Sequence, residues 1–451
     1  MATKLRCLLI GLLVCAGLVY AQEPPYANFM TLTVTERGGM ARTNWPVTVG
    51  VPIRYGEVTD PASFLYLVRE DGDRFEPTPF QLFAIVTPTA GAELQEAFEQ
   101  ATYPTDRPLL RLFEIGFPAN VDAYGAATYR LYYGEPTAPA PPVAPQRPLV
   151  YTGENPGIDI GIGEVIFHLN PQTGSLLYFT AGEKDYEFKQ SERRDVHYNP
   201  DVFVPHLSWG HTSDWNFDEP GPYTPSITIA QGPYAYRSFR KGMIPRANET
   251  LATFTYTFFA GLPIFYTSSS MEFTLDTLVY AVRNSEYVFS RGLMTKGFYA
   301  DADGRPQEVP LFNPDAPEII FGKVAALSPD VPYLGMLDEV SGVGMCVVNL
   351  ARYTSSYSMA DNAANPAAEY YIADPGMHQS TNPDYDFAYL VRPEIYQMTV
   401  VPKGSLFAER NAVIIFRAGQ GEQRYDDMLR WVHLIRTPPA ISVTPVIRTP
   451  Q

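Results

Sequence analysis

Apolar and polar residues alternate with a period of two along most of this chain, and this alternation predicts β-strands. The segment Thr253-Phe-Thr-Tyr-Thr-Phe258 shows it most clearly, because β-branched residues alternate there with aromatic ones. Before residue 136 the pattern predicts short strands at 28–35, 45–52, 64–69, 109–116 and 127–133. After residue 148 it predicts strands at 158–169, 251–259, 264–275, 286–289, 319–324, 342–350, 396–401 and 412–416. We therefore expect a mainly β protein whose antiparallel sheets stack face to face.

Helical spacing of apolar residues is confined to two segments of the sequence. One is 92–100, and the other is 423–435, where Tyr425, Met428 and Val432 recur at helical intervals. The second predicts a short C-terminal helix that packs against the sheets.

Proline marks the clearest boundary, since six of the thirteen residues at 136–148 are proline. Such a stretch is extended and stiff, as interdomain linkers often are. We expect a small β-barrel or sandwich over 22–135 and a large antiparallel β-domain with its helix over 149–451.

Composition and charge restrict the class of ligand. Apolar residues make up 45% of the chain and charged residues 18%, which is typical of a folded protein. Asp and Glu outnumber Lys and Arg by 49 to 33, so the net charge is −16. This charge repels polyanions and excludes a general nucleic-acid binder.

The N-terminus has the form of a secretory signal peptide. Lys4 and Arg6 precede the apolar run 7–19, and Val19-Tyr-Ala21 predicts cleavage before Gln22. A retained membrane anchor is the alternative, but the run is short for a membrane span. Cleavage leaves Cys346 as the one cysteine, expected to be a buried thiol in a strand. We therefore expect a secreted or periplasmic bacterial protein that does not contact the membrane after cleavage.

Several segments resemble a known family. Asn44-Trp-Pro-Val-Thr-Val-Gly-Val-Pro-Ile53 and Gly56-Glu-Val-Thr-Asp60 resemble the first strands of the RIFT-type barrel in exo-acting rhamnogalacturonan lyases. Thr253-Phe-Thr-Tyr-Thr-Phe-Phe-Ala-Gly-Leu-Pro263 is similar to the β-supersandwich of galactose-mutarotase-like domains and polysaccharide lyases. The resemblance implies a RIFT-like barrel at 22–135, a supersandwich at 149–451, and cleavage of a uronic-acid-containing glycan by β-elimination. No catalytic motif of the family aligns residue by residue.

The densest group of polar and aromatic residues follows residue 205. Trp faces stack on sugar rings, and His and Asp hydrogen-bond sugar hydroxyls, so this group predicts a glycan site. An ordered loop that caps the core is the alternative, and the histidine spacing is poor for a metal site. The candidate substrate-binding residues here are His206, Trp209, Asp214 and Trp215, with His211 as candidate base or charge neutraliser.

Two further groups are candidates for the chemistry of elimination. A cation beside a uronate carboxylate makes the C5 proton more acidic, so Arg237 is the expected carboxylate partner. The alternative for the basic group around Arg237 is a set of solvated charges at a strand edge. The alternative for the group around Tyr385 is a Tyr-rich packing surface. The remaining binding candidates are Tyr236, Arg240, Lys241, Tyr389 and Arg392, and the acid/base candidates are Tyr256, His378 and Tyr385.

The expected ligand is a polysaccharide or oligosaccharide, and no cofactor is expected. Asp301-Ala-Asp-Gly304 is similar to the start of a calcium loop, which leaves a structural Ca²⁺ open beside an ordinary turn. Besides a lyase, two hypotheses stay open. One is a glycoside hydrolase with a carboxylate pair such as Asp214 and Glu369, and the other is a non-catalytic glycan-binding protein.

Overall fold

The computed structural model divides the chain into two compact units, Met1–Pro145 with Pro438–Gln451, and Gln146–Thr437. The division at Pro145 lies within the proline-rich segment 136–148. The residues that the structure describes are 24–26, 28–54, 56–86, 110–138, 143–187, 195–197, 200–205, 207–218, 220–290, 292–311, 322–355, 370–374 and 387–446.

The smaller unit contains two antiparallel sheets and the four-residue helix α1 (Pro61–Phe64). Phe117 and Tyr129 link the sheets, with ring centroids 4.9 Å apart. No ladder joins the two sheets into a closed barrel in the part of the unit that the structure describes. One sheet has the order β30 (Ala440–Val446), β1 (Asn28–Thr35), β7 (Ala126–Tyr133), β3 (Leu65–Asp71), β4 (Arg74–Pro77), and the other β2 (Arg42–Arg54), β6 (Leu110–Val121), β5 (Gln81–Val86).

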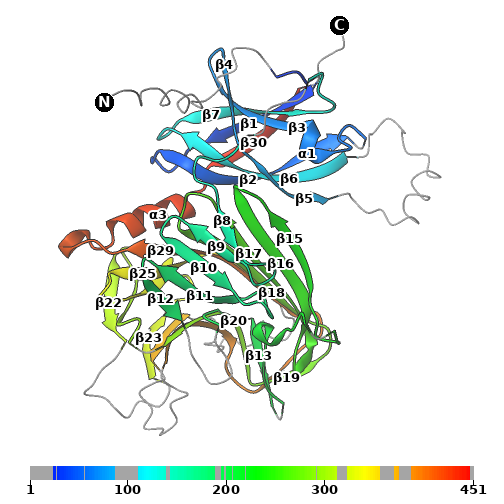
Figure 1. Ribbon diagram of the computed structural model, residues 1–451. Helices are drawn as coiled ribbons and strands as arrows, with labels where there is room; N and C mark the ends of the chain where they lie inside the picture. Colours follow the sequence, from blue (N-terminus) through cyan, green and yellow to red (C-terminus); the bar gives the residue numbers. More distant parts are fainter. Residues whose placement is uncertain are drawn as a thin grey trace, which may run out of the picture. The chain divides into compact units, whose positions relative to one another are not determined.

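The last strand of the chain belongs to this smaller unit. β30 pairs with β1 from Phe29↔Val446 to Thr35↔Ala440, so the two ends of the chain share one sheet (Figure 1). The sequence pattern placed residues 438–451 in the larger domain, and the pairing of β30 with β1 corrects this expectation. Local patterning does not identify the partner of a strand.

The larger unit is built on a nine-stranded antiparallel sheet. Its order is β15 (Ser226–Gln231), β16 (Ala235–Ile244), β17 (Ala247–Phe259), β18 (Ile264–Phe273), β29 (Leu406–Arg417), β25 (Val343–Ser355), β24 (Tyr333–Leu337), β21 (Lys296–Ala300), β22 (Pro306–Pro310). In β17 buried positions alternate with partly exposed ones over most of the strand, as its sequence predicts.

A second layer of strands covers this sheet. A six-stranded sheet has the order β14 (Ser208–His211), β13 (Asp201–Val204), β20 (Ala281–Ser290), β27 (Phe387–Ile395), β26 (Tyr370–Asp374), β23 (Gly322–Leu327). A five-stranded sheet has the order β12 (Lys184–Glu187), β11 (Leu176–Ala181), β10 (Val165–Leu169), β9 (Asp159–Ile162), β8 (Val150–Thr152). A two-stranded sheet pairs β19 (Thr277–Val279) with β28 (Thr399–Val401).

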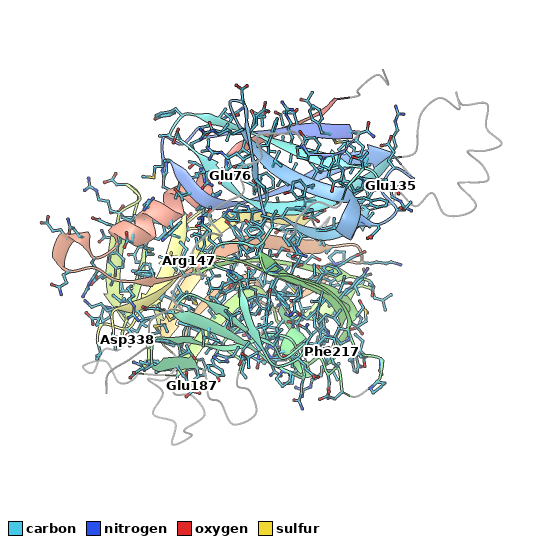
Figure 2. All side chains as sticks on the ribbon, turned by 45° about the horizontal axis from the view of Figure 1, so that its top comes forward. Glu76, Glu135, Arg147, Glu187, Phe217 and Asp338 are labelled. Carbon is cyan, nitrogen blue, oxygen red and sulfur yellow. The ribbon has the colours of Figure 1, made fainter. Side chains whose placement is uncertain are left out.

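Side chains between the layers show how they are stacked. The Phe167 ring of β10 lies 5.0 Å from that of Phe258 in β17. Asp338, labelled in Figure 2, accepts hydrogen bonds from Lys184 and Tyr186 of β12 and so ties the five-stranded sheet to the end of β24. The mainly β fold with stacked antiparallel sheets is confirmed.

The C-terminal helix predicted from spacing is α3 (Asp426–Arg436), which lies beside β29 and β25 (Figure 1). Cys346 is buried in β25, as expected of a strand thiol. The predicted helix at 92–100 lies outside the described residues. Among the described residues, no helix is both long and apolar enough to span a membrane.

Candidate functional site

Three ionisable residues form a row across adjacent strands of the six-stranded sheet. Asp201 of β13 is the ladder partner both of His211 in β14 and of Arg283 in β20. Direct cross-strand partners lie on the same face of a sheet, so the three side chains meet. His211 Nδ1 lies 2.9 Å from Asp201 Oδ2. Burial is nearly complete, since His211 is 2% exposed and Asp201 0%.

Arg283 holds two carboxylates at once. Its Nε donates to Asp201 Oδ1 at 2.9 Å, and a second guanidinium nitrogen donates to the other oxygen of the same carboxylate. Glu286 completes the group, with contacts to Arg283 of 3.1 Å and 3.0 Å. A guanidinium flanked by two bidentate carboxylates is rigidly placed. We call Asp201, His211, Arg283 and Glu286 the charged cluster.

An irregularity in β20 brings Arg283 and Glu286 together. In a regular strand, residues three positions apart point to opposite faces. The register between β20 and β27 shifts on both sides of Arg283, and the ladder skips Asn284 and Glu394. A buried hydrogen bond from the Ser269 hydroxyl of β18 to Asn284, 2.6 Å long, anchors the irregular segment to the nine-stranded sheet. Such a bulge redirects side chains, and here it places Arg283 beside Glu286.

The charged cluster lies on the face of its sheet that is turned away from the nine-stranded sheet. Ser285 hydrogen-bonds Glu409 of β29, so its side chain points toward the nine-stranded sheet. Glu286 follows Ser285 in the strand and therefore points the opposite way. Tyr389 of β27 is the ladder partner of Val288, two residues beyond Glu286, and lies on the same face as Glu286.

Aromatic rings adjoin the charged cluster. The Arg283 guanidinium carbon lies 3.9 Å from the centroid of the Trp209 ring, a cation–π contact. Trp209 contacts Phe203 at 5.1 Å, and Phe203 contacts Tyr280 at 5.6 Å between centroids. Tyr280 in turn lies 6.4 Å from Tyr396. The rings form a continuous series from the charged cluster to exposed side chains.

Tyr396 belongs to both the aromatic series and the electrostatic environment of the charged cluster. Partial burial raises the pKa of its hydroxyl, the charge of Arg283 lowers the pKa, and Glu286 raises it again. The side chain is nevertheless 51% exposed. A phenol in this position is open to solvent and responds to the charges of the cluster.

Gly210 fixes the position of the strand that carries Trp209 and His211. A Cβ added at Gly210 would lie 2.0 Å from the backbone oxygen of Pro245. Only glycine permits this approach, so β14 packs closely on one face while Trp209 and His211 occupy the other. Asp214, in the 3₁₀ turn Thr212–Asp214, accepts a hydrogen bond from the His211 backbone N–H at 3.3 Å and supports the same segment.

The basic group around Arg237 does not join this site. Arg237 pairs with Thr257 in the nine-stranded sheet, whereas His211 is in the six-stranded sheet. Alternation along β16 buries Tyr236 and Arg240 and leaves Lys241 exposed on the other face. His211 and Arg237, the expected base and the expected carboxylate partner, therefore lie in different sheets and do not form one site.

Arg240 and Tyr256 lie in a polar cluster inside the core. Arg240 donates to the backbone oxygen of Thr173 at 2.5 Å, and its guanidinium lies 5.3 Å from the Tyr256 ring. The Tyr256 hydroxyl accepts from the Leu176 N–H at 3.0 Å and lies 2.8 Å from His197 Nδ1. Burial lowers the pKa of His197 to about 3. Tyr256 is 0% exposed, so its position is that of a core residue, in place of the expected acid/base role.

Two other predicted substrate-binding residues, Trp215 and Arg392, are buried in the interior. Trp215 is buried and donates to the Met243 backbone oxygen at 2.8 Å. Arg392 points to the inner face, where its Nε lies 3.3 Å from both Glu394 and Glu409. Burial raises the pKa of Glu409 to about 7. The candidates His206, His378 and Tyr385 lie outside the described residues.

Four residues of this site were not predicted from the sequence pattern: Asp201, Arg283, Glu286 and Tyr396. Asp201 begins an otherwise apolar strand, Arg283 and Glu286 flank Asn284-Ser285 in β20, and Tyr396 follows the end of β27, so no recognisable motif surrounds any of them. For Asp201 the available signal was an ionisable residue in an otherwise apolar strand, because a buried charge requires a partner. That signal does not identify the partner, which comes from another strand.

The described residues contain no group of three or more His, Cys, Asp or Glu side chains placed to hold a metal ion. At the candidate calcium loop, Asp301 accepts from the backbone N–H groups of Asp303 and Arg305 at 2.9 Å and 2.8 Å. Its side chain thus closes the turn between β21 and β22, which supports the ordinary-turn alternative.

No known protein family and no curated protein matches the sequence. Among solved structures, an α-mannosidase from Enterococcus faecalis V583 is similar with a TM-score of 0.50 and 10% identity, over 92% of this chain and 46% of that one. A glycosyl hydrolase family 38 protein from Enterococcus faecalis has a TM-score of 0.49 and 10% identity, over 93% and 48% of the two chains. A galactose mutarotase-like protein from Lactobacillus casei has a TM-score of 0.31 and 7% identity, over 59% and 100%. The chain spans about half the length of the first two structures. At this identity the likeness to the α-mannosidase shows a shared fold alone.

Proposed function

We propose that this chain is a carbohydrate-active protein that cleaves a uronic-acid-containing glycan by β-elimination, with the charged cluster and Trp209 as its site. The observation that carries the proposal is the row His211–Asp201–Arg283, with the Arg283 guanidinium 3.9 Å from the Trp209 ring centroid. Aromatic faces stack on pyranose rings, and charged side chains bind hydroxyl and carboxylate groups.

The reaction needs a base, a group that neutralises the uronate carboxylate, and a proton donor. His211 is the proposed base because Asp201 holds its Nδ1 and stabilises the imidazolium formed when the ring takes the C5 proton. The electron pair of the C–H bond forms the C4–C5 double bond as the C4–O bond breaks. Arg283 is the proposed carboxylate partner, and Tyr396 the proposed donor of a proton to the leaving oxygen.

Hydrolysis is less well supported by the same geometry. A glycosidase needs one protonated carboxyl group as general acid. Arg283 contacts both Asp201 and Glu286, and a guanidinium favours the ionised form of each carboxyl. The charged cluster therefore offers a base and a cation more readily than a carboxylic acid.

Non-catalytic glycan binding is the second candidate, and the burial of the charged cluster favours it. His211 and Asp201 are almost fully buried, so a substrate reaches the imidazole only if covering residues move. Arg283 is already neutralised by two carboxylates, which compete with a uronate for it. Under this alternative, Trp209 and the exposed tyrosines bind sugar and no bond is cleaved.

The two candidates differ in what the protein does to a panel of glycans. Rhamnogalacturonan, ulvan, alginate and glycosaminoglycans would each be incubated with the protein, and unsaturated products followed by ultraviolet absorbance. We expect absorbance from one glycan, its loss in His211→Ala, and unchanged activity in Tyr353→Ala, which alters an exposed tyrosine of β25. Reducing ends without absorbance would indicate a hydrolase. Binding without products would favour the second candidate.

We further propose that the protein is secreted or periplasmic, on the basis of residues 1–21 of the sequence. Expression of the full chain in a bacterial host, followed by N-terminal sequencing of the exported protein, tests this. The expected first residue is Gln22. An intact Met1 on the cytoplasmic product would contradict it.

A further inference from the structure

An exposed apolar strip lies at the far end of the aromatic series. It consists of Leu278, Tyr280, Tyr396, Met398 and Val400, which we call the tyrosine strip, and these side chains are between 44% and 62% exposed. Contiguous exposed apolar side chains on a soluble protein commonly mark a binding surface.

The strip is centred on one face of the two-stranded sheet β19–β28, which contributes Leu278 and Val400. Leu278 and Val400 are direct ladder partners, so their side chains lie side by side. Thr277, Val279 and Val401, which alternate with them, are buried on the other face. The alternation therefore turns Leu278 and Val400 outward, and the exposed side chains of Tyr280, Tyr396 and Met398 lie in the segments next to these strands.

The strip is continuous with the site of the proposed function. The Tyr280 ring contacts Phe203, which contacts Trp209, and Trp209 covers Arg283. Tyr396 responds to the charges of Arg283 and Glu286 while its own ring contacts Tyr280. The ring contacts therefore connect Trp209 directly with the strip.

We propose that the tyrosine strip is a second saccharide subsite, which binds the part of a glycan chain that extends beyond the charged cluster. This inference rests on the proposed glycan site. A glycan is the occupant that fits, because pyranose rings present C–H faces to aromatic and aliphatic side chains. Their hydroxyls reach the phenol groups at the same time. The strip itself contains no charged residue. It therefore strengthens the binding of longer glycan chains and does not recognise a uronate carboxylate.

The test measures binding of oligosaccharides of increasing length, from the glycan identified in the panel, by calorimetry. In the wild type, affinity should rise with length until the strip is covered. Tyr280→Ala and Leu278→Ser should weaken binding of the long oligosaccharides about five- to tenfold and leave the shortest one unchanged. Tyr353→Ala is the control, because Tyr353 is 57% exposed and lies outside the strip. This variant should change neither the affinity for the long oligosaccharides nor that for the shortest one.

The outcomes separate the strip from the proposed function. Equal affinity of wild type and strip variants for every length would overturn the strip subsite alone. No binding of any glycan by the wild type would overturn both proposals. Light scattering provides a further check, because a drop in molecular mass in Leu278→Ser would identify a second copy of the chain as the occupant and overturn the subsite.

Discussion

Arg283 and Glu286 contact each other at 3.0 Å on one face of β20, although three positions separate them in the strand. The register shift around Arg283, anchored by Ser269 and Asn284, makes this contact. The proposed site therefore depends on a departure from regular strand geometry, and residues in the interior hold that departure in place.

Asp201→Asn should destabilise the larger unit. Asp201 is fully buried between Arg283 and His211, and removing its charge leaves the guanidinium with Glu286 alone. Breaking a buried ion pair in this way costs about 3–5 kcal/mol of unfolding free energy. Urea unfolding measures the loss.

The matched control for Asp201→Asn is Glu164→Gln. Glu164 contacts Arg417 at 3.3 Å, but both side chains are more than half exposed. Exposed pairs contribute little, so this variant should unfold like the wild type. An equal loss of unfolding free energy in the two variants would contradict a stabilising role of the buried Asp201 carboxylate.

Gly210→Ala should displace β14 and, with it, Trp209 and His211. The added methyl group would stand 2.0 Å from a backbone oxygen of Pro245, which cannot move aside as a side chain would. We expect a lower melting temperature and a shift in the tryptophan fluorescence spectrum. Gly261→Ala is the control for backbone strain without a steric clash. Gly261 has a φ of +82°, but the space around its Cβ position is open. A spectrum like that of the wild type for Gly210→Ala would contradict the close packing.

Tyr256→Phe should reduce stability without affecting glycan binding. The hydroxyl satisfies the Leu176 N–H and lies against His197 in the core. Leaving a buried donor without its acceptor costs about 1–3 kcal/mol. Denaturant unfolding measures this cost, and calorimetry with the glycan measures binding. Loss of catalysis in a variant that remains fully folded would instead restore Tyr256 as an acid/base residue.

Glu409 should make stability depend on pH. Burial raises its pKa from 4.5 to about 7, so the folded protein keeps a proton that the unfolded chain has released. The unfolding free energy contributed by this group therefore falls as pH rises through that interval, and is lowest above about 7. Glu409→Gln removes this contribution.

The measurement for Glu409 is the difference between wild type and variant in urea unfolding across the pH range. Taking the difference is necessary because Asp195 has a raised pKa of about 6 and His197 a lowered one of about 3, and both remain in the variant. The wild type should lose stability relative to Glu409→Gln as pH rises. A constant difference would show that the carboxyl group does not titrate in this interval.

The strands could be predicted from periodicity because the alternation of buried and exposed side chains involves residues that are neighbours in the chain. The alternation at 251–259 predicted β17, and the helical spacing around Met428 predicted α3. Over 158–169 the same pattern merged two strands, because Gly163, with a φ of +62°, turns the chain between β9 and β10. Periodicity determines which residues are buried and does not mark every turn.

The candidate site was only partly predictable. Trp209 and His211 stood out because polar and aromatic residues cluster around them in sequence. Arg283 did not, since its partner Asp201 is far away in the chain and only strand pairing brings them together. Arg240 and Arg237 looked alike in sequence, yet alternation along β16 buries Arg240 and turns Arg237 to the other face.

A mainly β chain with a C-terminal helix, a proline-rich segment and an aromatic group that includes Trp209 can all be predicted from the order of the residues. These follow from local spacing and composition, which act along the chain. The pairing of β30 with β1, and the row that His211, Asp201 and Arg283 form across three strands, become visible only in the folded chain. Strand partners and register are selected by the packing of whole sheets, because a shift of one residue moves every side chain of a strand to the opposite face.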